Sequence, residues 1–273
     1  MEPSQILMSN YPYYKYSLDY TLDSLALIGA SAIEFYACYP HFHVDDMGYR
    51  DVKVLADKLA SHHLSVVCFT PEQCLYPVNI AAVCPAARKR SMAVFQKSIQ
   101  YAAELGAELV LVLAGYGTLD EKEEHAWQRS VESLGILSDM AEAYGIQLVL
   151  ETSPREYTTT HDANDVVRMI QEVKSPALKG MIDTATLGFS QETMDGAIAA
   201  LGTYLRHVHV GDGVPNGHLI LGEGNLDIQG MMKSLKAANY SYALSLEILN
   251  DRYIREPEKA MQISYEKLKS YLV

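Results

Sequence analysis

The sequence is poor in basic residues. Its 273 residues include 22 lysines and arginines against 34 aspartates and glutamates, which gives a formal net charge of −12 at pH 7. A protein that binds DNA or RNA needs a basic surface to displace the counterions of the phosphates. The charge balance therefore argues against a nucleic-acid partner, and equally against adhesion to an anionic membrane.

Long apolar runs and signals of secretion are also missing. A membrane-spanning helix needs roughly 18 apolar residues or more, and no run in the sequence reaches that length. The first residues, MEPSQILMSNYP, lack the basic and apolar regions of a signal peptide. We therefore expect a cytoplasmic protein that does not enter a membrane.

Cysteines are few, and no two of them form a CxxC pair. The four are Cys38, Cys68, Cys74 and Cys84, all in the first third of the chain. In a sequence without a leader, this scattered spacing favours free thiols over disulfides or a thiolate zinc site.

A glycine-rich phosphate loop is absent as well. A doubly wound open sheet would carry a GxGxxG fingerprint after an early strand, but the first turn reads SNYPYYKYS. The segment LGEG at 221–224 has only two glycines and does not make this fingerprint. The doubly wound sheet is the alternative to the fold favoured below.

What the sequence does contain is a repeated strand–helix pattern. Short β-rich runs occur at Ile6–Met8, Ala32–Tyr36, Ser65–Phe69, Leu109–Leu113, Gln147–Thr152, Leu178–Asp183, Leu205–Val210 and Tyr242–Ile248. Amphipathic helical stretches lie between them, among them Arg88–Gly106, Ala126–Gly145 and 225–240, where Asp227 can cap the helix start. Eight such units with apolar strands predict an α/β fold, a closed (β/α)8 TIM barrel that forms one domain over residues 1–273.

Acidic residues and a histidine stand at the ends of the last four predicted strands. They are Glu151, Asp183, His209 and Glu247. A TIM barrel carries its active site at the C-terminal ends of its strands, so three carboxylates would converge there and repel one another. One divalent cation would resolve that repulsion, and this donor set suits Mn²⁺, Mg²⁺ or Co²⁺. A proton-sharing carboxylate cluster without metal is the alternative.

The stretch LRHVHVGDG carries two histidines on one face of a strand, because residues i and i+2 point the same way. His209 is nearest the strand end and is the candidate ligand. His207 lies one layer deeper and is a core residue or one that orients a neighbour. Asp212 either accepts hydrogen bonds in the following loop or is an ordinary turn residue.

At these residues the sequence resembles the xylose-isomerase-like barrel superfamily, and within it the sugar 3-epimerases, whose Glu–Asp–His–Glu metal set it matches. Four segments narrow the resemblance to fructoselysine 3-epimerases: IEFYACYPHFH, FTPEQCLYPVNI, HDANDV and GHLILGEGNL. The resemblance implies a metal-dependent isomerase that inverts C3 of a ketose or ketosamine through an ene-diolate, working as a homo-oligomer. Glu151 and Glu247 would be the two bases. The residues expected to contact the sugar are Glu34, His41, Glu72, Tyr76, Glu156 and His218.

Three positions depart from the ketohexose 3-epimerases. Thr186 stands where those enzymes have a histidine that holds a substrate hydroxyl, and Pro215 stands where they have an arginine. Glu156 follows Glu151 by five residues instead of six. Other activities remain open: a ketose–aldose isomerase or inosose-dehydratase-type enzyme on the same metal site, a phosphodiester-cleaving member, or a non-catalytic sugar-binding protein.

Overall fold

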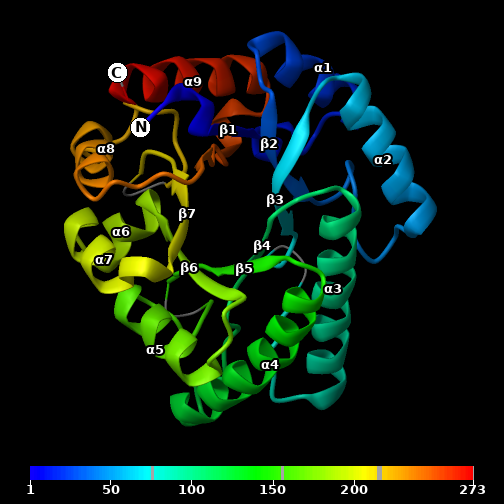
Figure 1. Ribbon diagram of the computed structural model, residues 1–273, viewed down its shortest axis with the longest axis vertical. Helices are drawn as coiled ribbons and strands as arrows, with labels where there is room; N and C mark the ends of the chain where they lie inside the picture. Colours follow the sequence, from blue (N-terminus) through cyan, green and yellow to red (C-terminus); the bar gives the residue numbers. More distant parts are fainter. Residues whose placement is uncertain (75–76, 155–156, 214–216, 273) are drawn as a thin grey trace.

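The computed structural model describes residues 1–74, 77–154, 157–213 and 217–272. Within this part of the chain, eight parallel strands pair in sequence order and close into a barrel, because β1 also pairs with β8. Helices surround the strands (Figure 1). The predicted fold, a TIM barrel, is confirmed.

The strands are β1 Ile6–Ser9, β2 Ala32–Ala37, β3 Ser65–Pro71, β4 Leu109–Val112, β5 Gln147–Leu150, β6 Leu178–Asp183, β7 Leu205–Val210 and β8 Leu244–Leu246. The α-helices are α1 Leu18–Ile28, α2 Tyr49–Ser61, α3 Pro85–Glu104, α4 Glu123–Ala143, α5 Ala163–Val173, α6 Thr184–Ser190, α7 Met194–Leu201, α8 Ile228–Ala237 and α9 Pro257–Leu272. Short 3-10 turns lie at Pro3–Gln5, Tyr11–Tyr13, Gly202–Tyr204 and Asp251–Tyr253. Each predicted strand is present, and β4, β5 and β8 are shorter than their predicted ranges.

Local sequence explains where several helices begin and end. The side chain of Asp227 accepts a hydrogen bond from the backbone N–H of Gly230 and so caps α8, as predicted. Gly106 and Gly145 follow α3 and α4 with φ of +72° and +71°. This left-handed conformation favours glycine and ends both helices. No helix in the described residues is long and apolar enough to cross a membrane.

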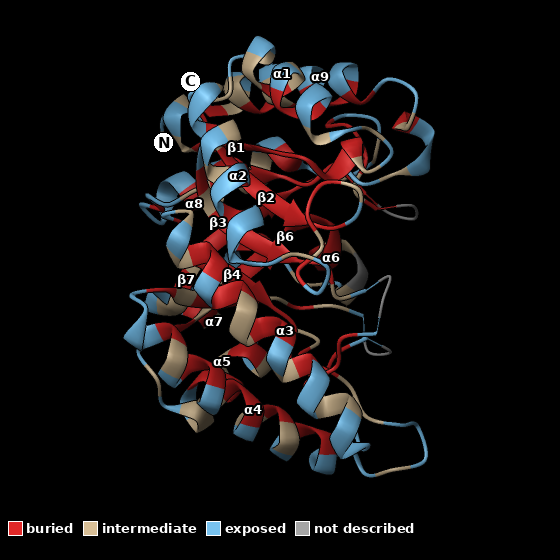
Figure 2. Ribbon diagram, turned by 90° about the vertical axis from the view of Figure 1, so that its right-hand side faces the viewer, coloured by how far each residue is buried: buried red, intermediate tan, exposed pale blue. Residues whose placement is uncertain are grey.

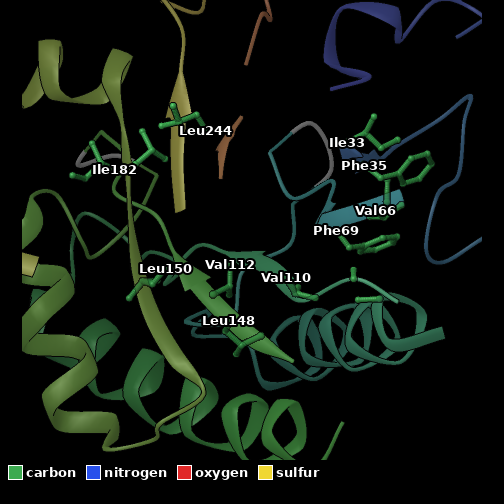
Figure 3. Packing of buried hydrophobic residues seen from close by; sticks show 14 of the residues in the cluster. Ile33, Phe35, Val66, Phe69, Val110, Val112, Leu148, Leu150, Ile182 and Leu244 are labelled. Atoms are coloured by element: carbon green, nitrogen blue, oxygen red, sulfur yellow. The ribbon is translucent and has the colours of Figure 1, made fainter. Parts of the chain in front are cut away.

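The apolar core has two layers, because successive strand residues point to opposite faces. One layer lies between the strands and the helices, where Ile33, Phe35, Phe69 and Leu150 pack with their neighbours (Figure 3). Figure 2 shows the strands buried and the outward faces of the helices exposed.

The second layer fills the barrel itself. It is a small cluster formed by Cys68, Leu109, Leu111, Val149 and Met181 on β3 to β6. The interior of β2, β7 and β8 is polar instead, with Glu34, both strand histidines and Ser245 fully buried. This polar part of the interior continues to the C-terminal ends of β7 and β8, where His209 and Glu247 lie.

Candidate active site and metal centre

The four predicted metal ligands are brought to one end of the barrel by the strands that carry them. Asp183 ends β6, His209 lies near the end of β7, and Glu151 and Glu247 directly follow β5 and β8. His209 Nδ1 lies 2.8 Å from Glu247 Oε2 and 3.4 Å from Glu151 Oε1. Parallel strands deliver their C-terminal ends to one side of the barrel, so these distances follow from the fold.

A second histidine joins this cluster from the loop after β7. His218 Nε2 lies 3.1 Å from Glu247 Oε2 and 3.4 Å from Asp183 Oδ2. The donor atoms therefore form two overlapping groups that share Glu247: one with Glu151 and His209, the other with Asp183 and His218. Within each group the donor atoms lie within 4.8 Å of one another.

These residues fit a divalent cation. Neighbouring ligand atoms around a cation bound at about 2.1 Å are about 3 Å apart, close to the separations of 2.8, 3.1 and 3.4 Å seen here. Three carboxylates with one or two imidazoles are the donors that Mn²⁺, Mg²⁺ and Co²⁺ accept. The cation would be held by Glu151, Asp183, His209 and Glu247.

The two glutamates of the cluster have pKa values shifted in opposite directions. Burial raises the pKa of Glu151 to about 7. Burial also acts to raise the pKa of Glu247, but the neighbouring His218 and His209 hold it below its usual range. For His209, burial alone would lower the pKa, whereas Glu34 and Glu247 raise it well above its ordinary value. Without a cation, Glu151 therefore holds a proton more readily than Glu247 does.

Asp183 is held by the start of α6. Its side chain accepts hydrogen bonds from the backbone N–H groups of Ala185 and Thr186, at 2.9 and 3.2 Å. The hydroxyl of Thr186 donates a third bond of 2.6 Å. Thr186 thus orients a predicted ligand, at the position where the ketohexose epimerases have a histidine.

Beside the cluster lies a cavity of about 270 Å³ with an aromatic wall. Tyr11, Tyr14 and Tyr36 line it together with Glu72, Glu151 and Glu247. The rings of Tyr11 and Tyr36 stack with centroids 4.6 Å apart. The arrangement can hold a small polar molecule with one face on an aromatic ring and the other toward the carboxylates.

Comparison with known proteins agrees with this architecture. Residues 22–271 match the model of the family described as "Xylose isomerase-like TIM barrel". The chain belongs to this family. It is 28% identical to a fructoselysine 3-epimerase of Shigella flexneri over 251 residues, which are 90% of each chain. It is 26% identical to a D-psicose 3-epimerase of Ruminiclostridium cellulolyticum over 201 residues, 71% of this chain and 66% of that protein.

A solved structure of an L-ribulose 3-epimerase superposes with a TM-score of 0.83 at 21% identity, covering 100% of this chain and 95% of the other. That similarity concerns the fold. The curated relatives with assigned activities are epimerases, and the protein is an isomerase of the epimerase type.

Among the residues expected to contact the sugar, Glu72 and His218 lie at the site. Glu72 lines the aromatic-walled cavity and accepts hydrogen bonds from the Tyr36 hydroxyl and the Cys74 backbone. His218 contacts two predicted metal ligands, as described above. Tyr76 and Glu156 are outside the described residues, as is Pro215.

Glu34 and His41 do not line this cavity, and the structure places them elsewhere. Glu34 lies fully buried beneath His209 and contacts both strand histidines. The ring of His41 lies 2.8 Å from the Asn10 amide and 3.1 Å from the Thr21 hydroxyl. It faces a separate groove beside Leu18 of α1. Both lie within the motif IEFYACYPHFH, whose pattern does not show which side chains reach the barrel mouth.

The loop after β7 is organised by Asp212. Its buried carboxylate accepts hydrogen bonds from the backbone N–H groups of Gly213, Gly222 and Leu226. Asp212 and Leu219 also exchange two backbone hydrogen bonds of 3.1 and 2.7 Å. Asp212 is therefore a hydrogen-bond acceptor in this loop and not an ordinary turn residue. Its hydrogen bonds fix the loop that carries His218.

The aromatic wall of the cavity was not predicted from the sequence. Tyr11 and Tyr14 follow β1 in the segment SNYPYYKYS, and Tyr36 lies in β2. Asp251, which accepts a 2.6 Å hydrogen bond from Tyr14, also lines the cavity. Tyrosines clustered directly after the first strand were the available signal, since that turn opens at the barrel mouth.

Proposed function

We propose that this protein is a metal-dependent sugar epimerase that inverts C3 of a ketose or ketosamine. The observation that carries the proposal is a pair of carboxylates, Glu151 and Glu247, that enter one cavity from β5 and β8. In the barrel those strands are separated by β6 and β7. Inversion at a carbon needs a base on one face and an acid on the other.

The two carboxylates have different proton affinities, which supports such a division of work. In the metal-free protein, burial raises the pKa of Glu151, whereas His218 and His209 lower that of Glu247, so Glu247 suits the role of the base and Glu151 that of the group that holds and releases a proton. A divalent cation on the ligands named above, which we expect to be Mn²⁺, Mg²⁺ or Co²⁺, would polarise the ketone and stabilise the negative charge that develops on its oxygen. The stacked tyrosines Tyr11 and Tyr36 would exclude water from one side of the sugar.

The charge of the cavity favours a substrate without phosphate. Its described lining residues include no lysine or arginine. They include two further acidic residues, Glu72 and Asp251, beside the two proposed catalytic carboxylates. A phosphate group or a nucleic-acid backbone would meet repulsion here. A neutral ketose or a ketosamine with a cationic amine would not.

A larger cavity adjoins the first and favours the ketosamine. It has a volume of about 720 Å³ and shares Tyr14 and Glu72 with the sugar cavity. Its described lining also includes Lys15, which can pair with a carboxylate at the end of a substituent. Fructoselysine, the sugar in the name of the Shigella relative, carries both an amine next to the sugar and a terminal carboxylate.

Proton exchange in D₂O tests the proposal. The Mn²⁺-loaded protein is incubated with D-fructose, D-psicose, D-tagatose and fructoselysine, and the sugars are followed by NMR. We expect deuterium at C3 together with the C3 epimer, fastest with fructoselysine. Exchange at C1 with formation of an aldose would instead identify a ketose–aldose isomerase, and dehydration would identify a dehydratase.

A Lys15→Met variant serves as a control for the substituent. It should lower kcat/KM for fructoselysine while kcat/KM for the free ketoses stays unchanged, because those sugars do not reach the second cavity. An equal effect on all substrates would contradict the ketosamine assignment and leave the epimerase reaction intact.

A further inference from the structure

Glu34 is the most heavily hydrogen-bonded acid beneath the site. Its side chain, on β2, is fully buried. It accepts from the Thr70 hydroxyl at 2.6 Å, from His207 Nε2 at 2.8 Å and from His209 Nε2 at 2.9 Å. The Tyr11 hydroxyl lies 3.3 Å away as a fourth donor. A carboxylate closed off by four donors cannot contact a substrate.

The two nitrogens of His209 contact different carboxylates. Nε2 faces Glu34, and Nδ1 faces Glu247 and Glu151. A neutral imidazole carries one N–H, and an ionised carboxylate only accepts. Glu34 therefore holds a hydrogen on Nε2, so that Nδ1, which faces Glu247, is the nitrogen that gives up its hydrogen and offers its lone pair when a cation binds.

We propose that Glu34 is a positioning residue for the metal centre, which fixes the tautomer and the ring orientation of His209 so that Nδ1 is the ligand atom. This inference rests on the metal site proposed above and is independent of the identity of the sugar. His207 completes the arrangement, because its Nε2 occupies the second oxygen of Glu34 and prevents that oxygen from turning away. Carboxylate partners of this kind typically change metal affinity by 10–100-fold when they are removed.

The same three residues could instead hold a cation of their own, since the donor atoms of Glu34, His207 and His209 also lie within 4.8 Å of one another. The separations of 2.8 and 2.9 Å between nitrogen and carboxylate oxygen are ordinary hydrogen-bond lengths. Two hydroxyl donors occupy the same carboxylate as well, and together they satisfy it without a cation. Elemental analysis separates the two arrangements, because a second cation would raise the metal content to two per chain.

The substitution Glu34→Gln tests the role with little change of shape. Glutamine has no charge and one acceptor oxygen for donors that now share two, so it holds the Nε2 hydrogen of His209 less firmly and lets that hydrogen move to Nδ1, where it blocks the cation. We expect the Kd for Mn²⁺, measured by titration calorimetry, to rise 10–100-fold. At saturating Mn²⁺ the KM for the sugar should equal that of the unaltered protein, since Glu34 does not touch substrate.

Thr70→Val is the matched control. It removes one donor from Glu34 while leaving the carboxylate in place, so the Kd for Mn²⁺ should stay within about threefold. An unchanged Kd in Glu34→Gln would overturn the positioning role, and so would a changed sugar KM at saturating metal, which would make Glu34 a substrate contact.

A second measurement needs no variant. In ¹⁵N-histidine-labelled protein loaded with Zn²⁺, NMR should show His209 with its hydrogen on Nε2 and the metal on Nδ1. Coordination through Nε2 would refute the proposal even if Glu34→Gln fails to fold. If the unaltered protein binds no divalent cation, the metal dependence of the proposed function fails first, which distinguishes the two failures.

Discussion

Replacement of Asp212 by asparagine should loosen the loop that carries His218. The carboxylate is 1% exposed and accepts from three backbone N–H groups: Oδ1 from Gly213 and Leu226, and Oδ2 from Gly222 at 2.7 Å. Asparagine keeps one acceptor oxygen but presents NH₂ to the Gly222 N–H. A hydrogen bond to a charged group contributes about 1.5–3 kcal/mol, and an unsatisfied buried donor costs about 1–3 kcal/mol.

Because these contributions overlap and the loop can relax, we expect a loss of about 2–4 kcal/mol in the free energy of unfolding. For a chain of this size that corresponds to a Tm lower by about 4–8 °C in calorimetry. Turnover should fall with it, since His218 loses its fixed place beside Asp183 and Glu247.

Asp227→Asn makes the same chemical change at a helix cap with one N–H donor. Asparagine caps helices as well as aspartate does, so the Tm of this control should not change. If Asp212→Asn has the Tm and kcat/KM of the unaltered protein, the carboxylate does not hold the loop and the reasoning is refuted.

Further perturbations test the cluster itself. Glu151→Gln or Glu247→Gln should lower turnover at least 10²-fold, and a near-normal rate at full metal content would remove the two-base mechanism. His209→Ala should lose bound metal in elemental analysis, and unchanged metal would exclude this ligand. The affinity for Mn²⁺ should rise about tenfold per pH unit for each proton displaced, because neighbouring carboxylates raise the pKa of His209 despite its burial. Calorimetry in buffers of different ionisation enthalpy counts those protons, and a pH-independent affinity would contradict the shift. Gly224→Ala should destabilise the protein, because its Cβ would lie 2.7 Å from the Gly213 nitrogen and overlap the Asp212 carboxylate. An unchanged Tm would show that the loop accommodates it.

The fold was predictable because the strands of a closed parallel barrel are short apolar runs whose ends are marked in the sequence. Asp183 and His209 could be placed at one edge without knowing any distance, since all parallel strands end on the same side. The extent of β8 was predicted less well. Its flanking residues Tyr242 and Ile248 have β-forming side chains, but only Leu244–Leu246 pair in the barrel.

The substrate wall was less predictable, because it depends on how deep each side chain lies within the barrel. Glu72 directly follows β3, whereas Glu34 lies in the first half of β2 and therefore deeper in the barrel, between His207 and Thr70. Periodicity gives the face of a strand but not the layer. His41 was misplaced because the loop after β2 directs its ring toward Asn10 and Thr21.

The barrel interior is apolar on one side and polar on the other, and this difference explains why the pKa values of Glu151 and Glu247 shift in opposite directions. Glu151 follows Val149 on the inward face of β5, and this side of the barrel is filled by the apolar cluster that includes Leu111 and Met181. Burial against such a surface raises its pKa and outweighs the opposite effect of the neighbouring His209. Glu247 follows Ser245 on β8 and faces the two imidazoles of the polar half, which keep it ionised. In the proposed epimerisation, we therefore expect Glu247 to be the base that removes a proton from one face of the carbon and Glu151 to be the acid that returns one to the other face.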